Sequence, residues 1–161
     1  RESLIIGQNI LFVGPCGTGK DHLMHAMAWR CFAPLDGSVT IVNGSSLRRD
    51  LRSASQEGGE THIIKRLVDT SLLCLSDPVP PSGDAVLTGY QADCLYQIVD
   101  SRWRKRRPIW ATINLPIGDM RQAAGQILSL PVWDRLIDGA LILACNWHSY
   151  RRPNAIIGGN V

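Results

Sequence analysis

The sequence lacks the patterns that mark membrane-spanning, secreted or zinc-binding proteins. No apolar run approaches the ~20 residues needed to cross a bilayer, and no signal peptide is visible. The five cysteines are scattered and none forms a C-x-x-C pair, so neither a zinc site nor a disulfide framework is indicated. No internal repeat or low-complexity segment occurs. These absences favour a protein of the reducing cytoplasm.

The composition is that of one ordinary globular domain. The chain has 161 residues, 45% hydrophobic and 19% charged, which is enough for one core. The formal net charge of +3 is compatible with nucleic-acid binding but does not by itself indicate it. The chain starts at Arg1 rather than at Met, so we expect it to be a piece of a longer protein.

Apolar strand-like runs alternate with helix-like segments along the chain. The expected strands are 9–13, 39–42, 72–75, 109–113 and 140–145. The expected helices are 19–31, 44–55, 61–70, 89–106, 116–128 and 132–137, the second capped by Ser45 or Ser46. The strands are almost continuously apolar, as burial on both faces requires. The alternation predicts a parallel sheet covered on both faces by helices, with a loose tail over 153–161.

A phosphate-binding loop is the most informative motif. It meets seven of the eight positions of the pattern G-x-x-x-x-G-K-[ST] and lies between a predicted strand and a predicted helix. Its residues are Gly14, Pro15, Cys16, Gly17, Thr18, Gly19, Lys20 and Asp21. The glycines let backbone N–H groups face phosphate oxygens, the helix N-terminus adds positive charge, and Lys20 supplies a point charge. We expect this loop and His22 to bind ATP or ADP.

Polar residues end two further strands. Ser76 and Asp77 follow the apolar run 72–75, where P-loop ATPases carry the acids that hold magnesium and assist hydrolysis. Asn114 follows the strand 109–113, where a polar side chain can touch the γ-phosphate or position a water molecule. The structural alternatives are that Asp77 begins a turn before Pro78, and that Asn114 caps the next turn.

Four blocks of the sequence resemble AAA+ ATPases of the DnaC helicase-loader and IstB transposition-helper type. They are GPCGTGKDHL at 14–23, LYQIVDSRWRKRRP with ATINL at 95–115, VWDRLIDG at 132–139 and NWHSYR at 146–151. The sequence MHA at 24–26 also resembles the DnaA initiator. The blocks follow the family's order from residue 9 to 152. The resemblance implies an α/β P-loop NTPase core over 1–152, in three α/β/α layers with a five-stranded parallel sheet and no C-terminal lid domain.

The resemblance also implies roles for matched residues. Lys20 would be the Walker A lysine, Asp77 the second Walker B acid and Asn114 the first sensor. Arg135 would be an arginine finger that reaches the nucleotide of a neighbouring subunit, which implies a homo-oligomeric ring or spiral. Arg151 is a weaker candidate for a second sensor. The structural alternative for Arg135 is a solvated charge paired with Asp134 or Asp138.

Two positions depart from the family pattern. Asp21 stands where a Ser or Thr binds magnesium, and Ser76 stands at the first Walker B acid. Both positions normally surround the same Mg²⁺ ion. One interpretation is that the site has degenerated, because the charge of Asp21 would repel phosphate. The other is that hydroxyl and carboxylate have exchanged places, so that Asp21, Ser76 and Asp77 still form an oxygen ligand set.

The family implies DNA, single-stranded or duplex, and a replicative helicase or transposase as partners. The basic run from Arg102 to Arg107 is better explained as the C-terminus of a helix than as a DNA-binding surface. Arg48, Arg49 and Arg52 are the stronger candidates for DNA contact. The rival functions are a nucleotide-insensitive adaptor with an AAA+ shell and, less favoured, a small-molecule kinase.

Overall fold

The computed structural model describes residues 7–32, 37–78, 87–115 and 128–151. Strands and helices alternate along most of the chain, as the sequence predicts. In order they are β1 (Ile10–Val13), α2 (Lys20–Phe32), β2 (Val39–Asn43), α3 (Gly44–Glu57), α4 (Glu60–Asp69), β3 (Leu72–Ser76), α5 (Gly89–Arg104), β4 (Ile109–Ile113), α7 (Leu130–Ile137) and β5 (Leu141–Ala144). No helix among the described residues is both long and apolar enough to cross a membrane.

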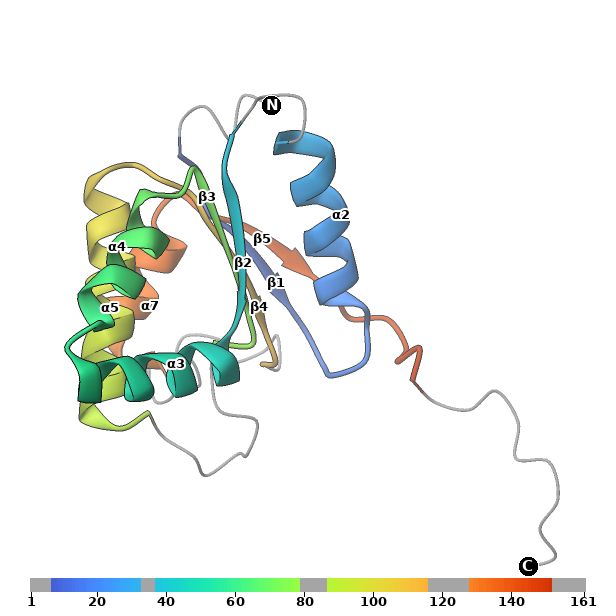
Figure 1. The fold of residues 1–161 in the computed structure, drawn as a ribbon. Helices are drawn as coiled ribbons and strands as arrows, with labels where there is room; N and C mark the ends of the chain where they lie inside the picture. The colour runs from blue at the N-terminus through green and yellow to red at the C-terminus, as the bar shows by residue number, and fades with distance from the viewer. Residues whose placement is uncertain (1–6, 33–36, 79–86, 116–127, 152–161) are drawn as a thin grey trace, which may run out of the picture.

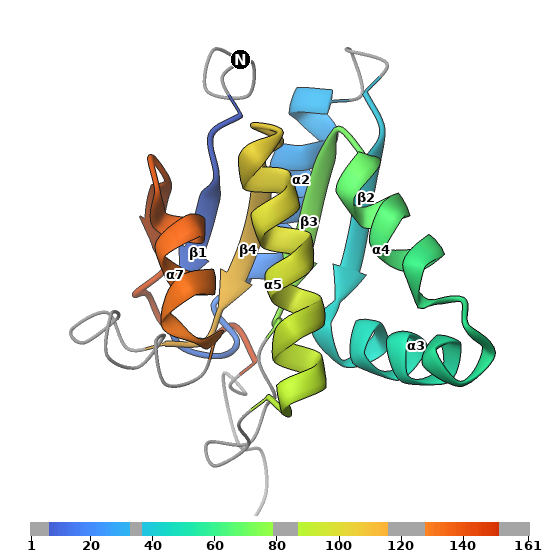
Figure 2. The ribbon, with the colours of Figure 1, turned by 90° about the vertical axis from the view of Figure 1, so that its left-hand side faces the viewer.

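The five strands form one parallel sheet in the order β2-β3-β4-β1-β5. Helix α2 covers one face, whereas α4, α5 and α7 cover the other (Figures 1 and 2). This three-layer α/β/α arrangement confirms the predicted fold class. Within the described residues β5 is the last element, and no helical lid follows it.

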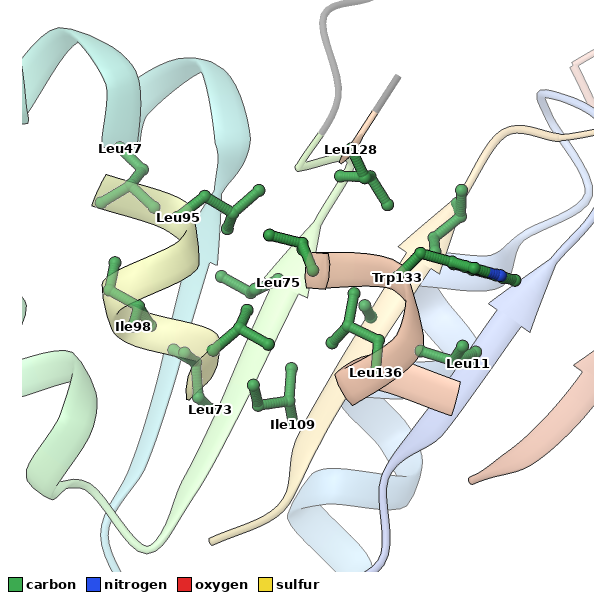
Figure 3. Close-up of a cluster of buried hydrophobic side chains, with 14 of the residues drawn as sticks. Leu11, Leu47, Leu73, Leu75, Leu95, Ile98, Ile109, Leu128, Trp133 and Leu136 are labelled. Atoms are coloured by element: carbon green, nitrogen blue, oxygen red, sulfur yellow. The ribbon is translucent and has the colours of Figure 1, made fainter. Parts of the chain in front are cut away.

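Side chains of successive strand residues enter opposite layers of the core. Phe12, Cys74 and Trp110 pack with Met24 of α2 in the smaller cluster. Leu11, together with its counterparts on β3 and β4, packs against α5 and α7 in the larger cluster (Figure 3). All of these residues are buried. Because the strand period is two, the same alternation decides which polar residues at the strand ends face α2.

One predicted helix cap differs from the structure, and two predicted segments lie outside the described residues. The predicted cap at Ser45 or Ser46 is wrong: Asn43 caps α3, and its side chain accepts a hydrogen bond from the Ser45 backbone at 2.9 Å. The reason is that β2 runs into α3 without a loop, so the last strand residue becomes the N-cap. The predicted helix over 116–128 lies outside the described residues except for residue 128. The predicted tail 153–161 lies wholly outside them.

Candidate functional site

A pocket of about 810 Å³ lies at the carboxyl ends of the strands. Its lining comes from four places in the chain: the phosphate loop with the first turn of α2, Asp77 after β3, Asn114 after β4, and the segment after β5. In open α/β sheets ligands bind at this edge, because the loops that follow parallel strands meet there. The pocket therefore collects most of the predicted nucleotide-binding residues.

The phosphate loop has the backbone shape that its glycines predict. Gly19 has φ +80°, a left-handed conformation that glycine adopts without strain. At Gly14 a Cβ atom would overlap the carbonyl oxygen of Cys145, the residue directly after β5. The ammonium group of Lys20 is buried and donates to the carbonyls of Gly14 at 3.0 Å and Pro15 at 2.7 Å. Lys20 thus holds the loop in shape and lies next to the pocket.

Asp21 contacts the ends of two strands. Its Oδ1 atom accepts hydrogen bonds from the hydroxyl of Ser76 at 2.9 Å and from that of Thr112 at 2.7 Å. Ser76 and Thr112 are register partners on β3 and β4, and both lie on the strand face that packs against α2. Since Asp21 is in the first turn of α2, the alternation of the strands directs both hydroxyls toward it. The two positions that depart from the family pattern are in direct contact.

Asp77 lies in a strained turn directly after β3. Its φ is +44°, which is uncommon for a residue other than glycine. Its backbone N–H donates to Thr112 Oγ1 at 3.1 Å, and its Oδ1 accepts from the amide of Asn114 at 2.7 Å. Burial and the negative charge of Asp21 raise the pKa of the Asp77 carboxyl, whereas Lys20 opposes the rise. The mutual repulsion of Asp21 and Asp77 would be relieved by a cation between them.

Helix α3 supports the same turn from the other side. The guanidinium of Arg48 donates to the carbonyl of Pro78 at 2.8 Å. At Gly44, the first residue of α3, a Cβ atom would overlap the carbonyl oxygen of Asp77. Arg48, a predicted DNA contact, therefore has a structural role here, whereas Arg49 and Arg52 are exposed.

The donors around Asp21 suit Mg²⁺ by their chemistry. They are two carboxylates and a hydroxyl, from Asp21, Asp77 and Ser76, and Mg²⁺ is commonly held by one or two carboxylates together with phosphate oxygens and water. Among the described residues no group of three or more His, Cys, Asp or Glu side chains is placed to hold a metal ion. A magnesium ion at this edge would therefore depend on the nucleotide for part of its coordination.

The segment after β5 packs onto the phosphate loop. The indole N–H of Trp147 donates to the carbonyl of Thr18 at 2.8 Å, and the backbone N–H of Tyr150 donates to that of Gly17 at 2.9 Å. Both residues and Arg151 line the pocket. Trp147, Tyr150 and Thr112 were not predicted as site residues. The signal that could have found the first two is the motif NWHSYR, which follows the strand next to the phosphate loop.

The pocket lining does not include four of the predicted site residues, which are Gly14, Pro15, Ser76 and Arg135. Of these, Arg135 is on a helix that contributes nothing to the lining. It lies on α7 and donates to Asp100 at 2.7 Å and to the hydroxyl of Tyr96 at 3.1 Å, with its guanidinium 4.9 Å from the centre of the Tyr96 ring. The structural alternative for Arg135, a solvated charge paired with Asp134 or Asp138, therefore names the wrong partner, because the carboxylate in contact is that of Asp100. The physical reason is that α7 packs along α5, which presents the carboxylate of Asp100 to this face.

The basic run at the end of α5 is used within the fold. Arg102 is fully buried and donates to five carbonyls between α4 and β4. Arg104 pairs with Asp100, while Lys105 and Arg107 pair with Asp69. This arrangement supports the structural interpretation of the run over DNA binding.

Comparison with known proteins places the chain in a family. A family model described as "IstB-like ATP binding protein" matches residues 5–156. An insertion sequence ATP-binding protein of Sinorhizobium fredii is 30% identical, over 93% of this chain and 49% of its own length. A similarly named protein of Geobacillus stearothermophilus is 30% identical, over 89% of this chain and 55% of its own length. The chain thus spans about half the length of these relatives.

Solved structures have the same fold at low sequence identity. The crystal structure of the DnaC helicase loader matches with a TM-score of 0.75 and 21% identity, covering 88% of this chain and 80% of that one. DnaA of Aquifex aeolicus bound to AMPPCP matches with a TM-score of 0.72 and 16% identity, covering 90% of this chain and 43% of that one. These matches confirm the predicted α/β/α fold.

Proposed function

We propose, from the premise that this chain belongs to the family of IstB-like ATP binding proteins, that it binds ATP at the carboxyl edge of its sheet. The observation that carries the proposal is the pocket of about 810 Å³ in which Lys20, Asp77 and Asn114 meet beside the phosphate loop. The loop offers backbone N–H groups and the positive end of α2 to an anion. A triphosphate is the anion that this arrangement fits best.

We further propose that the metal ligands have exchanged places rather than been lost. The contact between Ser76 and Asp21 supports this idea, because the exchanged groups face each other at 2.9 Å. Mg²⁺, when bound with the nucleotide, would offset the charge between the carboxylates and the phosphates. Without a cation, Asp21 places a negative charge at the helix terminus where phosphate should bind, so nucleotide binding should depend on magnesium.

Hydrolysis, which we expect to be slow, would rely on Asp77 and Asn114. The raised pKa of Asp77 favours its uptake of a proton, and its carboxylate faces the pocket, where it can orient a water molecule. The amide of Asn114 fixes that carboxylate through its hydrogen bond to Oδ1. This hydrogen bond supports a role for Asn114 in coupling the γ-phosphate to the orientation of Asp77.

The proposed role of Arg135 and the proposed binding partners rest on the similarity to the family and not on the geometry of the pocket. We propose that Arg135 acts on the nucleotide of a neighbouring copy, after leaving its contacts with Asp100 and Tyr96. One structural match is a helicase loader and another is DnaA bound to single-stranded DNA, so we propose a helicase or transposase and DNA as partners. The five free cysteines support a reducing, cytoplasmic location.

Calorimetric titration with ATP, with and without Mg²⁺, tests the proposed binding. We expect binding that requires magnesium and that is lost in Lys20→Ala but kept in Lys65→Ala, an exposed lysine on α4 that serves as control. No binding under either condition would favour the nucleotide-insensitive adaptor. Strong ADP binding without magnesium, together with no ATP turnover under any metal, would reject the exchanged ligand set.

A further inference from the structure

We propose that Tyr150 stacks on the base of the bound nucleotide. The inference rests on the proposed ATP binding and adds a contact to the nucleoside rather than to the phosphates. The groups already described, from Gly14 to Asp21 together with Asp77, supply N–H donors, charges and metal ligands. None of their side chains presents a flat apolar surface to an aromatic ring.

The backbone around Tyr150 is held on the phosphate loop. The Tyr150 N–H donates to the Gly17 carbonyl at 2.9 Å, and the Trp147 indole donates to the next carbonyl, that of Thr18, at 2.8 Å. The Tyr150 ring carbons lie 3.6 and 3.7 Å from the position of a Cβ atom at Gly19. The ring is thus placed beside the last glycine of the loop by contacts that do not involve its own polar atom.

The Tyr150 ring is nevertheless open to a ligand. The residue is 79% exposed and lines the pocket together with His22 and Leu23 of α2. Within the described parts of the chain its hydroxyl makes no hydrogen bond. A nucleoside that extends from the phosphates past the first turn of α2 meets this ring. Aromatic side chains stack on any base, because every base has a π-face.

Trp147, the other aromatic residue of the pocket, has a different role. Its indole N–H is used by the Thr18 carbonyl, so its orientation is tied to the loop. Trp147 therefore stabilises the loop, whereas Tyr150 retains a free ring face. This division predicts that removing the Tyr150 ring leaves the loop intact, since only the backbone N–H of Tyr150 takes part in holding Gly17.

Titration of two ligands against four proteins tests the proposal. The ligands are ATP and inorganic tripolyphosphate, each with Mg²⁺, and the proteins are wild type, Tyr150→Ala, Tyr150→Phe and Trp29→Ala. Trp29 is a matched control because it is 78% exposed but lies on α2 away from the pocket. We expect Tyr150→Ala to weaken ATP binding about tenfold or more, the size of one base–aromatic stack, and to leave tripolyphosphate binding unchanged. The Phe and Trp29 variants should bind both ligands like wild type.

The outcomes separate this proposal from the one it rests on. If wild type binds both ligands and Tyr150→Ala binds ATP equally well, only the stacking role is overturned. If Tyr150→Ala weakens both ligands equally, the ring supports the loop rather than the base. If Tyr150→Phe loses as much as Tyr150→Ala, the hydroxyl and not the ring makes the contact. If wild type binds neither ligand, the proposed ATP binding itself fails.

Discussion

Exchanging the side chains of residues 21 and 76 back to the usual family arrangement tests the magnesium site directly. The single variants are Asp21→Thr and Ser76→Asp, and the third protein carries both. Asp21→Thr removes the acceptor of the buried Ser76 and Thr112 hydroxyls, and each unsatisfied buried group costs about 1–3 kcal/mol. Ser76→Asp places two carboxylates in contact, and two like charges 4 Å apart repel by up to about 4 kcal/mol at an effective dielectric constant of about 20.

The double variant should recover most of both losses. It again has one carboxylate and one hydroxyl at the contact, so we expect its free energy of unfolding to lie within about 1 kcal/mol of wild type. Urea unfolding in EDTA measures the coupling between the positions, for which we expect a favourable value of about 2 kcal/mol or more. In magnesium the double variant should bind ATP, whereas Asp21→Thr alone should not raise turnover.

A control cycle pairs Ser76→Asp with Asp134→Thr. Asp134 is exposed on α7, which covers the opposite face of the sheet from α2, so these changes should add. The reasoning is refuted if the exchange at residues 21 and 76 is also additive within about 0.5 kcal/mol. That result would mean that the contact seen between the two side chains carries no energy, and degeneration of the site would then be the better interpretation.

Three further predictions concern single residues. The pKa of the Asp77 carboxyl is raised in the folded state. The free energy of unfolding should therefore fall as the pH rises from the ordinary pKa of an aspartate through the raised pKa of the folded protein, because the folded state must then lose a proton that it holds more tightly. Asp77→Asn should therefore melt above wild type at pH 7 in EDTA, with the difference vanishing near pH 3; a lower melting temperature at pH 7 contradicts this. Arg102→Met should lower the free energy of unfolding by about 3 kcal/mol or more in urea, since five carbonyls, four of them in buried hydrogen bonds, lose the guanidinium as a donor. The exposed Arg104→Met should cost less than about 1 kcal/mol, and equal losses would refute the argument. Arg135→Ala should lower the free energy of unfolding by about 1–3 kcal/mol, because it removes the contacts of the arginine with Asp100 and Tyr96. If Arg135 also acts in trans, the Arg135→Ala variant should show no ATP turnover in the assembled protein, at temperatures where it is still folded, and should still bind ATP.

The fold could be predicted from the sequence because its strands are short, buried and separated by clear helical segments. Each predicted strand lies within one or two residues of the observed one, and the parallel arrangement follows from the alternation with helices. The cap of α3 could not be predicted in the same way. It depends on β2 continuing directly into the helix, which the pattern of Ser45 and Ser46 does not reveal.

The candidate site was predictable where chemistry and chain position coincide, as for Lys20, Asp77 and Asn114. Arg102 and Arg135 show the limit, because their partners are backbone carbonyls and a carboxylate on other elements, which no local pattern encodes. The face of the sheet to which each strand side chain points is also encoded in the sequence. Counting in twos from Cys74 and Trp110, which face α2, assigns Ser76 and Thr112 to that face as well.

The position of Thr112 changes how the departure at residue 21 should be understood. A degenerating site would leave the carboxylate of Asp21 without partners, whereas this carboxylate accepts two hydroxyl hydrogen bonds from neighbouring strands. Thr112 also accepts the backbone N–H of Asp77, so one hydroxyl links both acids of the site. Thr112→Val, which keeps the shape of the side chain, should therefore weaken magnesium-dependent ATP binding although residue 112 does not line the pocket. Calorimetry of Thr112→Val beside Thr40→Val, on the edge strand β2, provides the comparison. Equal ATP binding in the two variants would show that the acids hold their positions without this link.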